Sequence, residues 1–116
     1  LVTFEGRVRD NDPEADGVVE RLEYSAHPDA QAVLAEVIDE FSRDASHPAG
    51  EVRIAAHHRI GSLDVGDVAI IVCVAASHRT DTFRICQDVV EQIKARVPIW
   101  KKQFTATDEG TWLGLS

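Results

Sequence analysis

The chain of 116 residues contains no methionine, only two cysteines and only three lysines. It also lacks any apolar run near the roughly 20 residues that a membrane-spanning helix needs, and no signal peptide is visible. The formal net charge is −8 at pH 7. Phosphate backbones require an extended basic face, so this acidic balance argues against a nucleic-acid-binding protein.

The length and the share of hydrophobic residues, 44%, are those of one globular domain. We therefore expect a single domain over residues 1–116. The chain opens with the strand-like segment Leu1-Val-Thr-Phe instead of a methionine. From this opening we expect that native N-terminal residues precede Leu1.

The cysteines and histidines do not form the spacing of a metal site. Cys73 lies in an apolar strand-like run and Cys86 on the apolar face of a helix pattern. Both are typical of buried thiols in a reduced, cytoplasmic protein. The adjacent His57 and His58 should point to opposite sides of a strand. We expect neither a metal nor a cofactor.

The order of elements is strands, helix, strands, helix, strand. Strands are expected over 1–8, 18–25, 52–60, 67–76 and 99–105, with a short one at 111–113. This order predicts an α+β fold, a two-layer sandwich of a mainly antiparallel sheet with two main helices. We expect a turn over 61–66, and a mobile acidic loop over 10–17 that closes as a lid next to Arg9.

Each predicted helix carries one apolar stripe at spacings of three and four. The first helix begins near Pro28, and the second ends at Pro98, because proline cannot continue a helix. The stripes are Val33, Leu34, Val37, Ile38 and Phe41 in the first helix, and Phe83, Cys86, Val89, Val90, Ile93 and Val97 in the second.

All three lysines fall within nine residues. Lys94, Lys101 and Lys102 flank a Pro-Ile-Trp bend, and Arg96 lies between them. Cations gathered in an acidic chain predict an anion site. The competing interpretation is a helix C-terminus that favours cations, followed by a solvated strand end; it explains Lys101 and Lys102 less well.

Two further groups of cations have functional and structural interpretations. Ser77, His78 and Arg79 stand where a buried strand gives way to a helix, so they are either an anion-binding cluster or an ordinary helix start. Arg7 and Arg9 share one face of a strand, which alone is usually a solvated face.

Taken together, the segments 3–9, 58–61, 77–79 and 97–102 resemble the MoaE family, the large catalytic subunit of molybdopterin synthase. The resemblance runs from Val2 to about Trp112. It implies the α/β hammerhead fold of that family. It also implies a sulfurtransferase of molybdenum cofactor biosynthesis that lies in the cytoplasm.

The resemblance implies a partner and a substrate. The partner is a small ubiquitin-like, MoaD-like subunit, whose C-terminal Gly-Gly carries sulfur as a thiocarboxylate and enters a pocket of the large subunit. The substrate is cyclic pyranopterin monophosphate, which receives two sulfurs as a dithiolene. Relatives pair through their large subunits, so the resemblance implies a homodimer within a heterotetramer.

The resemblance also implies which residues act. Lys94 and Lys101 are the expected catalytic residues. The expected substrate-binding residues are Phe4, Arg9, His78, Arg79 and Lys102. The catalytic lysines, with Arg9, His78 and Arg79, are expected to converge on one pocket. Many relatives carry an acidic residue where this chain has Gln103.

Two functions from other classes are also compatible with the cations. One is a non-catalytic domain that binds a phosphorylated metabolite or the acidic tail of a partner. The other is a structural α+β module whose lysines form a solvated helix end. An enzyme requires a cleft that holds Lys94 together with Lys101, whereas the other two do not.

Overall fold

The computed structural model describes residues 1–9, 19–43, 52–105 and 111–114, and the side chains among them except those of 19–20, 102–105 and 111–114. The two helices are α1 (Ala30–Ser42) and α2 (Arg79–Arg96). The strands are β1 (Val2–Arg7), β2 (Val19–Ala26), β3 (Arg53–His58), β4 (Gly61–Asp64), β5 (Val68–Ala75), β6 (Ile99–Thr105) and β7 (Thr111–Gly114). The predicted acidic loop over 10–17 lies outside the described residues.

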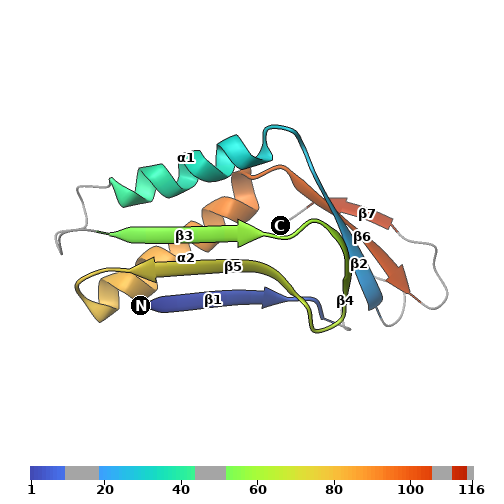
Figure 1. Cartoon of the computed structure of the whole chain (residues 1–116), viewed down its shortest axis with the longest axis horizontal. Coiled ribbons are helices and arrows are strands. Elements are labelled where there is room, and N and C mark those ends of the chain that lie inside the picture. The colour runs from blue at the N-terminus through green and yellow to red at the C-terminus, as the bar shows by residue number, and fades with distance from the viewer. Residues whose placement is uncertain (10–18, 44–51, 106–110, 115–116) are drawn as a thin grey trace.

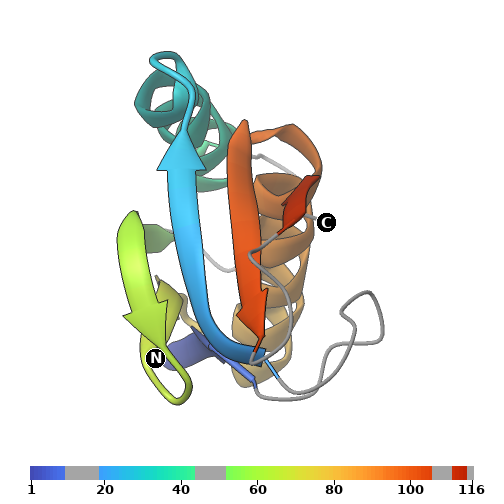
Figure 2. The same ribbon diagram turned by 90° about the vertical axis from the view of Figure 1, so that its right-hand side faces the viewer.

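The strands form two antiparallel sheets instead of the one sheet expected. The three-stranded sheet has the order β1-β5-β3, and the four-stranded sheet has the order β4-β2-β6-β7. Figure 1 shows the second sheet crossing one end of the first, and Figure 2 looks onto the second sheet. The α+β class and the antiparallel pairing are confirmed. The division into two sheets leaves room for a cavity between them.

The core lies between the three-stranded sheet and the two helices. In β5, Ile70, Val72 and Val74 point into this core and are at most 7% exposed. Their neighbours Ile71 and Cys73 lie on the opposite face and are only half-buried. The expectation that Cys73 is fully buried is therefore wrong, because no helix packs on that face of the described structure.

The helix α2 buries a stripe that differs slightly from the predicted one. Ile85, Val89 and Ile93 are at most 1% exposed, whereas Phe83, placed in the stripe from sequence, is 58% exposed. Thr82 takes the inward position, and its hydroxyl donates a hydrogen bond to the carbonyl of His78 at 2.8 Å. That bond lets a polar side chain be buried at the first turn.

The segment predicted as a turn contains the short strand β4. Gly61 and Gly66 bound this segment, and both have positive φ angles, +92° and +93°. Glycine adopts this conformation without the steric cost of a side chain. Between the glycines, β4 pairs with β2 and buries Leu63. Leu63 thus brings the second sheet onto the common core.

Candidate functional site

A cavity of about 380 Å³ opens where the two sheets meet. Its volume lies in the range of small-molecule sites. The three-stranded sheet contributes the end of β1, the start of β5 and the end of β3 to its wall. The second sheet contributes residues of β2 and β6, and α2 contributes its last turn. The lining residues are Phe4, Glu5, Gly6, Arg7, Val8, Arg9, Leu22, Tyr24, His58, Ala69, Ile70, Lys94 and Lys101.

Lys94 reaches this cavity from the last turn of α2. Val90, one turn earlier on the helix, and the C-cap residue Val97 are buried, so the backbone at this turn is held against the core. Lys94 itself is exposed and lines the cavity. A cation in the last helical turn also interacts favourably with the helix dipole.

Lys101 enters the same cavity from β6. Pro98 follows the last helical residues, and the chain turns directly into β6, whose residue Lys101 stands opposite Tyr24 of β2. Opposed residues in an antiparallel pair lie on the same face of the sheet. The predicted pairing of Lys94 with Lys101 at one cleft is therefore confirmed. The side chain of Lys102 lies outside the described residues.

Two arginines reach the cavity from the end of β1, Arg7 within the strand and Arg9 just after it. The pairing with β5 shifts between Gly6 and Arg7, at the edge of the cavity. Arg7 is fixed there: it donates to the carbonyl of Gly66 at 2.9 Å and pairs with Glu5 at 2.9 Å. Arg9 is exposed and lines the cavity, as does the ring of Phe4.

Gly6 is needed where β1 passes the cavity. A Cβ atom at this position would lie 2.6 Å from Cγ2 of Ile70, which is itself buried. No real Cβ atom tolerates such a contact without movement of its neighbour. Glycine therefore keeps the wall of the cavity close to β5.

Two aromatic residues in the wall were not predicted as functional. Tyr24 and His58 meet edge to face, with ring centroids 4.9 Å apart and an interplanar angle of 69°. Burial lowers the pKa of His58, and the neighbouring His57 adds to that effect, against the opposing influence of the Arg59 carbonyl. The alternation of β3 could have indicated His58, since its inward face includes Ile54 and Ala56.

Arg96 does not belong to the cavity, although it lies among the lysines in sequence. Its guanidinium donates to both carboxylate oxygens of Glu40 on α1, at 2.6 and 3.1 Å. This hydrogen bonding lowers the pKa of Glu40 and raises that of Arg96. Arg96 therefore joins the two helices. It does not belong to the anion site that was predicted from Lys94, Arg96, Lys101 and Lys102.

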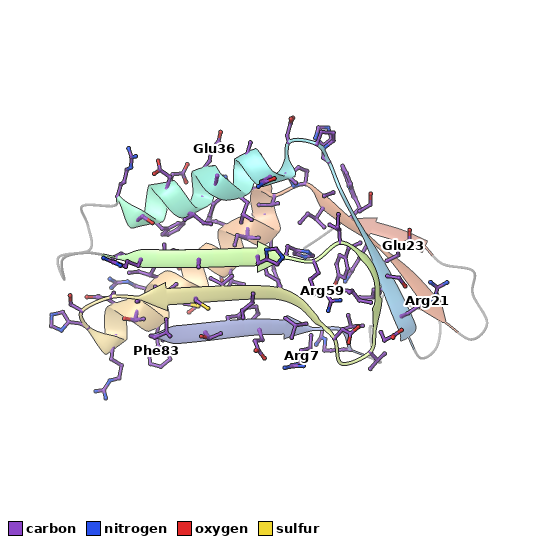
Figure 3. The ribbon with its side chains drawn as sticks, in the orientation of Figure 1. Arg7, Arg21, Glu23, Glu36, Arg59 and Phe83 are labelled. Atoms are coloured by element: carbon purple, nitrogen blue, oxygen red, sulfur yellow. The ribbon has the colours of Figure 1, made fainter. Side chains whose placement is uncertain are left out.

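His78 and Arg79 stand at the opposite end of α2 from Lys94. Fifteen residues separate Arg79 from Lys94, which amounts to roughly 22 Å along a helix that rises 1.5 Å per residue. Both residues are exposed, and neither lines the cavity. In Figure 3, Phe83 of the first half of α2 lies at one end of the three-stranded sheet, and Arg7, which lines the cavity, lies near the other end. The expected convergence of all five residues is therefore wrong within one chain.

The chemistry available in the described part of the chain is that of a cationic pocket. Four cations line the cavity, from Arg7, Arg9, Lys94 and Lys101, beside the carboxylate of Glu5. Among the described residues, no group of three or more histidine, cysteine or acidic side chains is placed to hold a metal. Cys73 and Cys86 are free thiols, and burial raises the pKa of Cys86.

No helix among the described residues is both long enough and apolar enough to cross a membrane.

The fold and site define an α+β protein with a cavity between two sheets that is lined by cationic side chains, and comparison with known proteins identifies its family. The family model described as MoaE protein matches residues 1–96. Molybdopterin synthase catalytic subunit 1 of Mycobacterium tuberculosis is 37% identical over 114 residues, 98% of this chain and 74% of that protein. The molybdopterin synthase catalytic subunit of Thermoplasma volcanium is 35% identical, over 97% of this chain and 78% of that protein.

A solved structure agrees with this similarity. The crystal structure of molybdopterin synthase from Staphylococcus aureus superposes with a TM-score of 0.84 at 35% identity, covering 97% of this chain and 78% of the other. The chain belongs to the MoaE family. The α/β hammerhead architecture expected from the resemblance is thereby confirmed.

Proposed function

We propose that this chain is the catalytic subunit of a molybdopterin synthase. It transfers sulfur from the C-terminal thiocarboxylate of a small MoaD-like subunit to cyclic pyranopterin monophosphate and so forms the dithiolene of molybdopterin. The observation that carries the proposal is the meeting of Lys94 and Lys101 at one cavity, in a chain of net charge −8. The reaction itself is inferred from the membership of the chain in the MoaE family.

The pocket suits the two anions that the reaction brings together. A thiocarboxylate and a cyclic phosphate repel each other and the acidic surface, and the four cations of the cavity offset that repulsion. Arg9 is proposed to bind the phosphate. A guanidinium presents a planar fork of donors that matches phosphate oxygens. The ring of Phe4 offers a flat apolar wall to the pterin.

Lys94 and Lys101 are proposed as the catalytic residues. Their ammonium groups hold the thiocarboxylate and stabilise the negative charge that develops on its tetrahedral adduct. Donors that are already in place before the reaction make the largest contribution to such stabilisation. Sulfur arrives on the partner, so the thiols of this chain take no part. For Lys102 we propose a supporting role in substrate binding.

His78 and Arg79 are proposed to act on the substrate of a second copy of the chain. They are too far from Lys94 to reach the cavity of their own chain, because most of α2 lies between them. A homodimer that places the start of one α2 beside the neighbour's cavity would complete each site. We propose this homodimer as the centre of a heterotetramer with two small subunits.

Two further assignments accompany the proposal. The buried cluster draws residues from both sheets and both helices, which supports one domain over residues 1–116. We propose the cytoplasm as the location of the protein. The free thiols Cys73 and Cys86 are in keeping with a reducing compartment.

The test is reconstitution. The purified protein is mixed with the thiocarboxylated small subunit and cyclic pyranopterin monophosphate, and the dithiolene product is measured. We expect product, and we expect none when the small subunit ends in an ordinary carboxylate. Absence of product, under conditions in which the Staphylococcus aureus synthase forms it, would contradict the proposal and favour a non-catalytic anion-binding domain.

A further inference from the structure

His58 lines the cavity, and the catalytic scheme above gives it no role. It is the last residue of β3, and its side chain is half-buried in the wall while that of His57 is exposed on the other face. In the part of the chain that the structure describes, the other ionisable groups that line the cavity are Glu5, Arg7, Arg9, Tyr24, Lys94 and Lys101.

One ring nitrogen of His58 is committed to the backbone. Nδ1 lies 2.6 Å from the carbonyl oxygen of Arg59. A carbonyl oxygen can only accept, so Nδ1 must carry the hydrogen and donate it. In the neutral ring this leaves Nε2, the tip atom of the side chain, without a hydrogen and able to accept a proton.

The ring is also held in orientation. Tyr24, only 8% exposed, meets it edge to face. Tyr24 is itself fixed by the register of β2, which places it opposite Gly61 on one side and Lys101 on the other. A side chain fixed by a hydrogen bond and by packing is preorganised in the way that general catalysis requires.

The proposed reaction needs a proton acceptor that the cations cannot provide. When sulfur leaves the partner's terminal glycine, the carbonyl carbon must gain an oxygen in its place, and water supplies it. Ammonium and guanidinium groups have donors but no acceptor. Glu5 is already paired with Arg7. Burial lowers the pKa of His58, which favours the neutral imidazole, and Nε2 of the neutral ring can accept a proton.

We infer that His58 is the general base of the hydrolytic half-reaction, an inference that depends on the proposed function. The sulfur, already bonded to the pterin carbon, joins it to the glycine carbonyl as a thioester. Nε2 takes a proton from water as the water oxygen bonds to the carbonyl carbon. The carbon–sulfur bond to the glycine breaks, and sulfur leaves with the electron pair on the pterin. The second water proton goes to solvent as the glycine becomes a carboxylate.

The substitution His58→Asn distinguishes a role as general base from a purely structural role of His58. The side-chain amide in His58→Asn can still donate to the Arg59 carbonyl, but it has no basic nitrogen at the position of Nε2. The matched control is His57→Asn, which changes the adjacent exposed histidine. We expect His58→Asn to lower the single-turnover rate by about 10²–10⁴-fold, as is usual for loss of a general base. At a pH well above the ordinary histidine pKa of about 6.5, where His57 no longer affects the protonation of His58, the control should stay within about twofold of the wild-type rate.

Two readouts identify the step. In His58→Asn the thioester between the small subunit and the pterin should accumulate, and mass spectrometry would detect it. In the wild-type protein the rate should fall as pH drops through the lowered pKa of His58, and this dependence should vanish in the variant. A His58→Asn protein with the wild-type rate and pH profile would overturn the inference, and so would loss of rate without thioester.

Nitrogen NMR of the wild-type protein provides a test that does not depend on a variant's folding. We expect the tautomer with hydrogen on Nδ1 and a titration midpoint below the ordinary histidine value of about 6.5. The opposite tautomer would overturn the inference. If the wild-type protein forms no product at all, the proposed function fails. If it forms product at a rate that His58→Asn preserves, only the role of His58 fails.

Discussion

The two ends of helix α2 carry similar cations in different surroundings. At the C-terminal end, Lys94 stands at a cavity walled by both sheets. At the N-terminal end, His78 and Arg79 are exposed beside Phe83, a large apolar side chain that is 58% exposed. One end borders a cavity, and the other has Arg79 and His78 beside an uncovered aromatic ring. The difference suggests that each chain supplies one full wall of a site and a second set of residues for a neighbour.

The largest effect should come from removing the cation at the pocket end. Lys94→Ala should lower sulfur transfer by about 10²–10³-fold, the usual loss when a preorganised charge-stabilising group is removed. Lys94→Arg should restore little, because a planar fork does not replace a compact ammonium group. The measurement is the single-turnover rate of dithiolene formation.

The matched control for Lys94 lies on the same helix. Arg84 is a cation that pairs with Asp81 at 2.8 Å, away from the cavity. Arg84→Ala should keep the wild-type rate, and both variants should keep the melting temperature within a few degrees. If Arg84→Ala and Lys94→Ala reduced the rate equally, the loss would follow from the change in net charge of the protein. The position of Lys94 at the cavity would then not explain it.

A mixture of two inactive variants tests the link between the two ends. Lys94→Ala and Arg79→Ala should each be impaired alone. After subunit exchange, half of the dimers contain one chain of each kind, and one of their two sites is intact. Activity should therefore return to about a quarter of the wild-type value. Failure to recover, with exchange shown by mass spectrometry, would place both residues in one chain's site.

The packing of the pocket wall predicts a moderate change in stability. Gly6→Ala should destabilise the protein by about 1–3 kcal/mol, because the added methyl group meets Cγ2 of Ile70 at 2.6 Å. Denaturant unfolding measures the free energy change. In an Ile70→Ala background the same substitution should cost less. An equal cost in both backgrounds would show that this contact does not constrain the wall.

The smallest effect concerns Arg96, the cation next to the pocket that faces away from it. Because the pKa of Glu40 is lowered in the folded state, its contribution to stability is present above the ordinary pKa of 4.5 and is lost as pH falls through the lowered value. The melting temperature of Glu40→Gln should lie below wild type at about pH 7, and the gap should close as pH falls through the lowered pKa of Glu40.

Glu36 provides the control for that pair. It lies 3.9 Å from Arg96, compared with 2.6 Å for Glu40. At about pH 7, where both carboxylates are charged, Glu36→Gln should change the melting temperature less than Glu40→Gln. A gap for Glu40→Gln that persisted unchanged in acid would mean that the charge of this carboxylate does not matter.

Local sequence patterns predicted the elements well and their mutual placement less well. The stripe containing Val89 and Ile93, and the stop at Pro98, define α2 without any long-range information. The same stripe misplaced Phe83, because positions at its edge are decided by how the helix packs. The strand character of residues 61–64 was missed because its evidence is the pairing of Leu63 with β2.

In the candidate site too, local sequence predicted the placement of some residues and not of others. Lys94 and Lys101 are close in sequence, and a turn at Pro98 brings them together, so spacing could predict their meeting. Arg96 lies between them but faces Glu40, a residue 56 positions away, which no local pattern reveals. His78 and Arg79 were expected at the same pocket because cations scattered over the surface would not collect two anions. The length of α2 decides otherwise.

The most direct test of the central claim follows the sulfur atom. The small subunit is prepared with an isotopic label in its thiocarboxylate and incubated with cyclic pyranopterin monophosphate and either wild-type protein or the Lys94→Ala/Lys101→Ala double variant. The pocket account predicts that the label moves to the pterin with the wild-type protein and stays on the small subunit with the double variant. Transfer of label at the same rate with both proteins would contradict the account.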